Sequence, residues 1–333
     1  MDDTGLMIVM AYPETVVMVA DEWYSPYLRY FGIGKKNYVR AGHAALVLIE
    51  KKTAIIEYHD FGRYITPEPH GRVRGKDTDH ELDFPLTAKL NGNRILNLDE
   101  ILHFLGTHPN LTHGEGKLIA SVCDTINYEK ARAHISMMQG RDFIRYAAFL
   151  EDGCNCARFV SGALIAGVTN ELIRKRLIRS KRFTPSTIGN VVLADTQDHI
   201  YEISERGDIG EFSSTVRREN LRYFLDRLKG HQPNYIGTLH PKPVNTIKPH
   251  AQWLGGIAAG AWFELYRTDH QIVFRCRRIS PYGRIDVNGL YKVQDDTFVL
   301  DDDYSFVHYS NCKFFHVQQN GKIFRFDFIE RLN

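Results

Sequence analysis

Two apolar segments joined by a short polar connection constrain the fold of this chain more than any other feature. Residues 38–49 read YVRAGHAALVLI, and residues 53–59 read TAIIEYH. Both segments are rich in residues that favour strands. The polar link from Glu50 to Lys52 is short enough for an antiparallel hairpin. The sequence therefore predicts two adjacent strands, each of which carries a histidine, His43 and His59.

Helices are predicted to follow this strand pair. Residues 60–85 are polar and punctuated by proline and glycine, which indicates a long ordered loop. Residues 98–105 and 115–139 then show apolar spacing typical of helices. After a turn at Asp152-Gly153, the small and apolar run that begins at Cys156 suits a buried helix. Cys156 is predicted to lie in the first turn of that helix.

The composition changes near residue 251, where aromatic and β-branched residues begin to alternate between turn signals. This pattern predicts a small antiparallel β domain, and four prolines before it mark a linker: Pro233, Pro241, Pro243 and Pro249. We therefore predict an α+β protein with three parts: a catalytic domain at 1–185, a helical and strand connection with a proline-rich linker at 186–250, and an all-β domain at 251–333.

Charge and cysteine content narrow the classes of partner and compartment. The 42 basic and 40 acidic residues give a net charge of +2, which does not favour binding to nucleic acid. Five cysteines, an odd number, argue against a disulfide framework and favour a reducing, cytoplasmic location. No run of about 20 apolar residues predicts a membrane span, although peripheral membrane contact stays open. Cys154 and Cys156 lack a second ligand pair at zinc spacing, so neither a metal nor a cofactor is predicted.

A cysteine at a helix start and a histidine on a strand can form a nucleophile and its base. The unpaired N–H groups and the dipole of a first helical turn stabilise a thiolate, and Cys156 is placed there. His43 can hold the thiolate as an ion pair and protonate the leaving group. His59 is the predicted third group, with Glu57 on the same strand face. The Cys156 N–H and a donor from Asn155 or Tyr58 are predicted to form the oxyanion hole.

Each of these residues also has a simpler interpretation. A cysteine in an apolar helix is most often a buried small hydrophobe, and a histidine in an apolar strand is most often a satisfied core residue. Cys154 is an alternative nucleophile, but it precedes the helix start, where the dipole helps less. The combination of the three positions favours catalysis more than any one of them does.

GHAALVL, a second histidine on the next strand and NCARFV at a helix start resemble the permuted papain-like proteins, over roughly residues 35–170. This group contains the lecithin:retinol acyltransferase-like enzymes and the permuted NlpC-type peptidases. The family pattern Asn-Cys-x-x-Phe corresponds to Asn155, Cys156 and Phe159. The resemblance implies a circularly permuted papain-like domain in which the histidine strand precedes the cysteine helix. One departure is Arg158, at a position where the acyltransferases often have a histidine.

The main functional hypothesis is a cysteine peptidase or amidase that cleaves a peptide or peptidoglycan-type amide bond through an acyl-enzyme. Arg63, Arg72 and Arg74 are candidates for a rim that recognises a substrate carboxylate, against the alternative of a salt-bridged surface loop. Two other functions stay open. One is an acyltransferase or thioesterase that acts on a lipid with the same cysteine and histidine. The other is a catalytically inactive binding or scaffold protein.

Overall fold

The computed structural model of the chain describes residues 2–35, 37–229, 241, 244–257 and 259–332, so most of the predicted proline-rich linker lies outside the described residues. The chain forms two compact units. The first contains residues 1–62 and 83–232, and the second contains residues 63–82 and 233–333. The boundaries of these units differ from the three predicted ranges, because residues 63–82 pack with the C-terminal segment. The α+β class is confirmed, with antiparallel sheets packed on helices and a separate C-terminal β unit.

The sheet of the first unit is built around its first strand. Its strands follow the order β5-β4-β1-β9-β11-β12, and all neighbouring pairs are antiparallel. All eight residues of β1 are buried because the strand lies between two others and is covered on both faces. The predicted hairpin is confirmed, with Ala45 opposite Asp60 and Leu46 opposite His59. The strands are β1 (Gly5–Tyr12), β4 (His43–Glu50), β5 (Ile56–Gly62), β9 (Leu118–Ile126), β11 (Tyr201–Ile203) and β12 (Ile209–Glu211).

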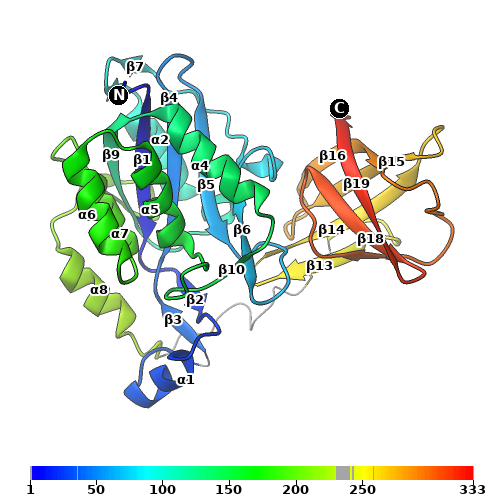
Figure 1. Cartoon of the computed structure of the whole chain (residues 1–333), viewed down its shortest axis with the longest axis horizontal. Coiled ribbons are helices and arrows are strands. Elements are labelled where there is room, and N and C mark those ends of the chain that lie inside the picture. Colours follow the sequence, from blue (N-terminus) through cyan, green and yellow to red (C-terminus); the bar gives the residue numbers. More distant parts are fainter. Residues whose placement is uncertain (1, 36, 230–240, 242–243, 258, 333) are drawn as a thin grey trace. The chain divides into compact units, whose positions relative to one another are not determined.

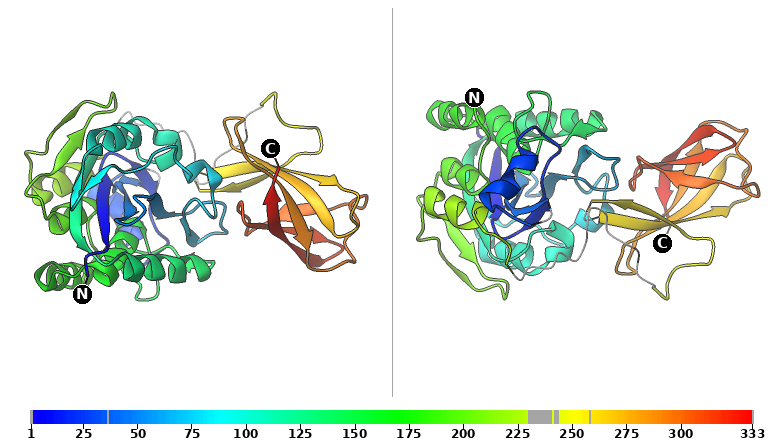
Figure 2. Two further views of the ribbon diagram at one scale, coloured as in Figure 1. Left: turned by 90° about the horizontal axis from the view of Figure 1, so that it is seen from above. Right: turned by 90° about the horizontal axis from the view of Figure 1, so that it is seen from below.

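Helices cover this sheet, as Figures 1 and 2 show. α5 and α7 pack on β1, β4 and β9, α4 packs on β4, and α2 packs near β9 and β11 on the other face. The main helices are α2 (Leu98–Thr107), α4 (Tyr128–Gly140), α5 (Cys156–Gly167), α6 (Glu171–Lys181), α7 (Thr187–Ala194) and α8 (Val216–Phe224). No described helix is long and apolar enough to cross a membrane.

The first unit also contains several shorter strands and helices. They are β2 (Val16–Met18), α1 (Ser25–Leu28), η1 (Arg29–Phe31), β3 (Tyr38–Arg40), β7 (Leu90–Asn91), β8 (Arg94–Ile95), α3 (Pro109–Thr112) and β10 (Ile144–Arg145). β2 and β3 pair with each other as a small antiparallel sheet, which lies before the start of β4 in the chain.

The predicted helix at 115–139 is wrong in its first half. Residues 118–126 form strand β9, which pairs with β1, and the helix α4 begins only at Tyr128. The segment LIASVCDTI contains four β-branched residues, which suit a buried strand, and pairing with β1 favours the strand over the helix. Asn127 then caps α4, because its side chain accepts a hydrogen bond from the Lys130 N–H.

The second unit is a nearly closed, barrel-like sheet with the strand order β13-β14-β15-β16-β19-β18-β17. The Gln252 side chain joins the two ends of this sheet, because it donates to the Tyr304 carbonyl and accepts from the Phe306 N–H. Aromatic side chains fill the interior, among them Phe263, Phe315 and Phe326. The strands are β13 (Gln252–Gly256), β14 (Ala259–Arg267), β15 (Val273–Ile279), β16 (Ile285–Val293), β17 (Ser305–Val307), β18 (Phe314–Gln319) and β19 (Lys322–Arg331).

Residues 63–82 belong to this second unit and are not the plain loop that the sequence predicted. They contain β6 (His70–Arg74) and the short helix η2 (His80–Leu82). The Cys312 N–H donates to the Thr78 carbonyl, and the Arg278 guanidinium lies between acidic side chains of this segment and of β16. Buried ion pairs therefore attach the segment to the barrel.

Candidate active site

Cys156 is the first residue of α5, as predicted. Asn155 is the N-cap, and its Oδ1 accepts a hydrogen bond from the Arg158 N–H at 2.9 Å. The Cys156 side chain is almost fully buried, with 6% of its residue surface exposed. Its N–H and that of Ala157 lie in the first turn, where a helix supplies no carbonyl partner. A negative charge that develops near the sulfur therefore meets N–H groups and the positive end of the helix dipole.

His43 opens β4 beside Cys156 and Asp60. Its Nε2 lies 3.3 Å from Asp60 Oδ2. Since Nε2 faces Asp60, Nδ1 is the ring nitrogen available to Cys156. Burial lowers the pKa of His43, but the interactions of the imidazole with Asp60 and with the Cys156 thiol outweigh burial and raise the pKa from 6.5 to about 9. The site therefore favours the imidazolium form at neutral pH.

Asp60, rather than His59, is the third group of the site. It is fully buried on β5, and the Tyr58 hydroxyl donates to its Oδ2 at 3.0 Å. The same hydroxyl also lies 3.2 Å from the Thr112 carbonyl. The Tyr58 hydroxyl, predicted as a possible oxyanion donor, therefore contacts the Asp60 carboxylate and the Thr112 carbonyl.

The predicted third group, His59, faces the other side of β5. Its Nε2 lies 3.4 Å from Glu57 Oε2. Glu57 in turn accepts a hydrogen bond from Tyr128 and pairs with Arg132 of α4 at 2.7 Å. Successive side chains of a strand point to opposite faces, so neighbours in sequence separate into two clusters. The structure thus places both the predicted triad member His59 and the auxiliary residue Glu57 in a cluster with α4.

The other predicted thiol, Cys154, lacks the features of a nucleophile. It lies two residues before α5 in the buried turn, and its Sγ is 3.4 Å from the Asn155 carbonyl. Burial raises its pKa to about 12, against the opposing effect of Arg158. Cys154 is therefore a neutral thiol near pH 7.

The predicted arginine rim is not an exposed rim. Arg72 and Arg74 are buried in the second unit. Arg72 makes a bidentate pair with Asp79 at 2.6 and 2.7 Å, and Arg74 lies 3.9 Å from the centre of the Tyr64 ring. Arg63 is half-buried. Acidic residues of the same segment pair with Arg72 and Arg74, but these pairs are buried and do not belong to an exposed surface loop.

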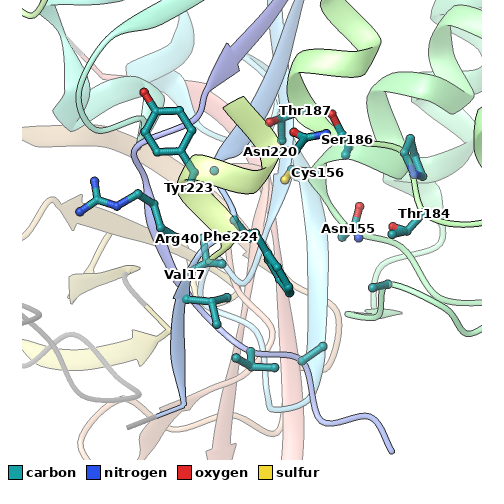
Figure 3. Close-up of a pocket in the computed structure, with 18 of the residues that line it drawn as sticks. Val17, Arg40, Asn155, Cys156, Thr184, Ser186, Thr187, Asn220, Tyr223 and Phe224 are labelled. Carbon is teal, nitrogen blue, oxygen red and sulfur yellow. The ribbon is translucent and has the colours of Figure 1, made fainter. Parts of the chain in front are cut away.

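A cavity of about 790 Å³ opens beside Cys156 within the first unit. Figure 3 shows the Cys156 sulfur facing it, with Asn155, Thr184 and Ser186 on one side and Arg40, Tyr223 and Phe224 on the other. Sequence reasoning missed the walls from residues 183–188 and 220–224. Their pattern of aromatic and small polar residues is not distinctive, and only the fold brings them to Cys156. Among the described residues, no group of three His, Cys, Asp or Glu side chains is placed to hold a metal ion.

These observations define a class: an α+β protein with a buried cysteine–histidine–aspartate group at a helix start, beside a cavity. Residues 7–173 match the family described as type VI secretion system effector TseH-like, and the protein belongs to that family. The matched range contains His43, Asp60 and Cys156. Residues 251–329 match a second family, described as the DUF6695 C-terminal domain.

One solved structure is similar to this chain: the crystal structure of the type VI secretion system effector TseH. The sequence identity is 15% and the TM-score is 0.39, over 63% of this chain and 98% of that chain. No curated protein matches the chain.

Proposed function

We propose that the first unit is a cysteine hydrolase of the permuted papain-like kind, with Cys156 as nucleophile, His43 as acid and base, and Asp60 as the residue that orients His43. The contact of His43 with both Cys156 and Asp60 carries this proposal. The chain order, with the histidine strand before the cysteine helix, is the one that the permuted arrangement requires. The family description further supports a role as a type VI secretion system effector.

The proposed reaction has two stages. The Cys156 thiolate attacks the acyl carbon of the substrate, and the bond from that carbon to the leaving amine or alcohol breaks. His43 donates its proton to this leaving group. Water then attacks the thioester while His43 accepts its proton, and the acid product leaves with the thiolate restored. The N–H groups of Cys156 and Ala157 are the donors that the first helical turn offers to the oxyanion.

Amide cleavage is the main hypothesis for this reaction, and the three groups act in the same way on an ester carbonyl. Acyl transfer to a lipid would use the same first stage with a different acceptor. These activities share one step, the formation of an acyl-enzyme on Cys156, and this is the step to test.

The experiment measures acylation of the full chain by an activated short-chain ester, such as p-nitrophenyl acetate, with intact mass analysis. We expect one acyl group per chain, located on Cys156, and no adduct on Cys156→Ala. Cys154→Ala is the matched control and should be acylated like the unaltered protein. Equal acylation of Cys156→Ala and the unaltered protein would remove the hydrolase proposal and leave the inactive binding protein.

A further inference from the structure

The cavity beside Cys156 has the size and the lining of a ligand site for an apolar chain. Its volume of about 790 Å³ lies within the range of roughly 300–1,000 Å³ that small-molecule sites occupy. Its walls come from β2, β3, the turn before α5, the segment before α7, and α8. Apolar side chains dominate these walls, among them Val17, Val39, Tyr146, Phe149, Phe183 and Phe224.

The described lining offers little to a charged ligand. Arg40 is its one charged side chain, and its Nε pairs with Asp226 Oδ2 at 2.9 Å while Nη1 donates to the Glu14 carbonyl at 3.0 Å. A peptide with carboxylate or ammonium groups would lose its hydration in this cavity without gaining an unengaged charged partner. A hydrocarbon chain has no such cost, because its burial is favourable by about 0.8 kcal/mol per CH₂ group.

Aromatic side chains continue from the cavity to the protein surface. Trp23 and Phe183 line the cavity, yet 76% and 73% of their surfaces are exposed. Ring contacts connect them through Tyr24 and Phe149: the centroid distances are 6.0 Å for Trp23–Tyr24, 5.1 Å for Tyr24–Phe149 and 5.1 Å for Phe149–Phe183. Single exposed apolar residues are normal on protein surfaces. A connected row of rings at the edge of a reactive cavity instead indicates an apolar ligand.

We propose that this cavity binds the hydrocarbon chain of a long-chain acyl lipid, so that the group transferred to Cys156 is a fatty acyl group. This inference rests on the proposed function and names its substrate class. The ester or amide bond of the lipid breaks, the bond from the acyl carbon to Sγ forms, and His43 protonates the released alcohol or amine. Water then releases the fatty acid. The row Trp23, Tyr24, Phe149 and Phe183 guides the chain from the lipid into the cavity.

The first test compares p-nitrophenyl esters from acetyl to decanoyl, each below its micelle concentration, with the full chain. Each buried CH₂ is worth about a fourfold gain, so we expect kcat/KM to rise at least 100-fold along the series. Val17→Trp, which fills the cavity, should reduce the ratio of the decanoyl rate to the acetyl rate more than tenfold. Val192→Trp, on the exposed side of α7 and outside the cavity lining, is the matched control.

A second variant guards against misfolding of the first. Phe183→Ser replaces an exposed ring and should lower the ratio of decanoyl to acetyl acylation severalfold. A flat chain-length profile in the unaltered protein, or faster cleavage of a charged peptide anilide than of the decanoyl ester, would overturn the lipid assignment.

Binding separates this inference from the proposed function. The Cys156→Ala variant should bind a fluorescent fatty acid, and the added Val17→Trp change should weaken that binding at least tenfold. Acetylation of Cys156 without any fatty-acid binding overturns the lipid assignment and keeps the hydrolase. Fatty-acid binding that Val17→Trp weakens, without acylation by any ester, supports the cavity assignment and overturns the hydrolase.

Discussion

The two units bury their polar groups in different ways. In the first unit, Cys156, His43 and Asp60 form a short row that ends at a cavity. In the second unit, Arg278 lies among Asp79 at 3.5 Å and Glu81 and Asp286 at 3.2 Å, while Arg72 holds Asp79 from the other side. The second cluster uses its charges to neutralise one another, whereas the first ends in a side chain that faces open space.

The arginines of the second unit affect the pKa values of the neighbouring carboxyl groups to different extents. Burial raises the pKa of Asp79, but Arg72 and then Arg278 outweigh it and hold that pKa far below its usual range. Burial and the nearby Glu81 raise the pKa of Asp286 to about 8, despite Arg278. Asp286 therefore shares the cluster as a neutral acid near pH 7. A buried polar cluster is thus a poor indicator of an active site unless it meets a cavity.

The largest expected effect distinguishes the two faces of β5. Asp60→Asn removes the charge that stabilises the His43 imidazolium and should lower kcat/KM for acylation by on the order of 10³-fold. His59→Gln, the matched control on the opposite face, keeps a hydrogen-bond donor near Glu57 and should change the rate less than tenfold. Stopped-flow acylation kinetics measure both. A larger loss in His59→Gln than in Asp60→Asn would restore the triad predicted from the sequence.

The next effect concerns stability in the second unit. Asp79→Ala leaves Arg72 and Arg278 without a shared buried counter-charge and should lower the free energy of unfolding by about 3–5 kcal/mol. Asp301→Ala is the control. It removes an ion pair of similar length, 2.6 Å to Arg267, whose side chains are 77% and 64% exposed, and should cost less than about 1 kcal/mol.

Denaturant unfolding of the Asp79 and Asp301 variants is best followed in a Trp23→Phe background. The two remaining tryptophans, Trp253 and Trp262, both report on the second unit. Equal losses of stability for the two aspartate variants would contradict the distinction between closed and exposed pairs.

The smallest effect is a pH dependence. The folded-state pKa of His43, about 9, exceeds its usual 6.5, so the stabilising proton is present below about pH 6.5 and is lost as the pH rises through 9. Since acylation by an amide needs this proton for the leaving group, the rate should fall about tenfold per pH unit above 9. In Asp60→Asn this fall in the rate should begin at a lower pH, because the substitution removes the largest favourable interaction of the imidazolium. If the rate fell at the same pH in Asp60→Asn as in the unaltered protein, this would argue against the orienting role of Asp60.

Part of the site could be predicted from local sequence alone. The start of α5 at Cys156 follows from Asn155, a good N-cap residue, and from the apolar run after it. The strand around His43 follows from its apolar neighbours. Both depend on interactions within a few residues, which sequence patterns record directly.

The third group could not be predicted in the same way. The sequence indicated a strand that ended at His59, whereas β5 continues to Gly62. Asp60 therefore seemed to begin a loop, although it is the fifth residue of β5. A difference of one position moves a strand side chain to the opposite face. Likewise, Arg72 and Arg74 pair with Asp79 and Glu81 of the same segment, but the burial of these pairs depends on how the segment packs within the second unit.

The walls of the cavity come from segments near residues 13–42, 146–157, 183–188 and 220–224, which are far apart in the chain. Such non-local contacts form late, because each requires closure of a long loop. The hydrophobic cavity is therefore a property of the completed first unit and of no shorter piece of it. During refolding, a chain-length preference in acylation should return only when α8 has packed against the rest of the cavity. The time at which this preference returns would therefore report the docking of α8, independently of any spectroscopic signal from the sheet.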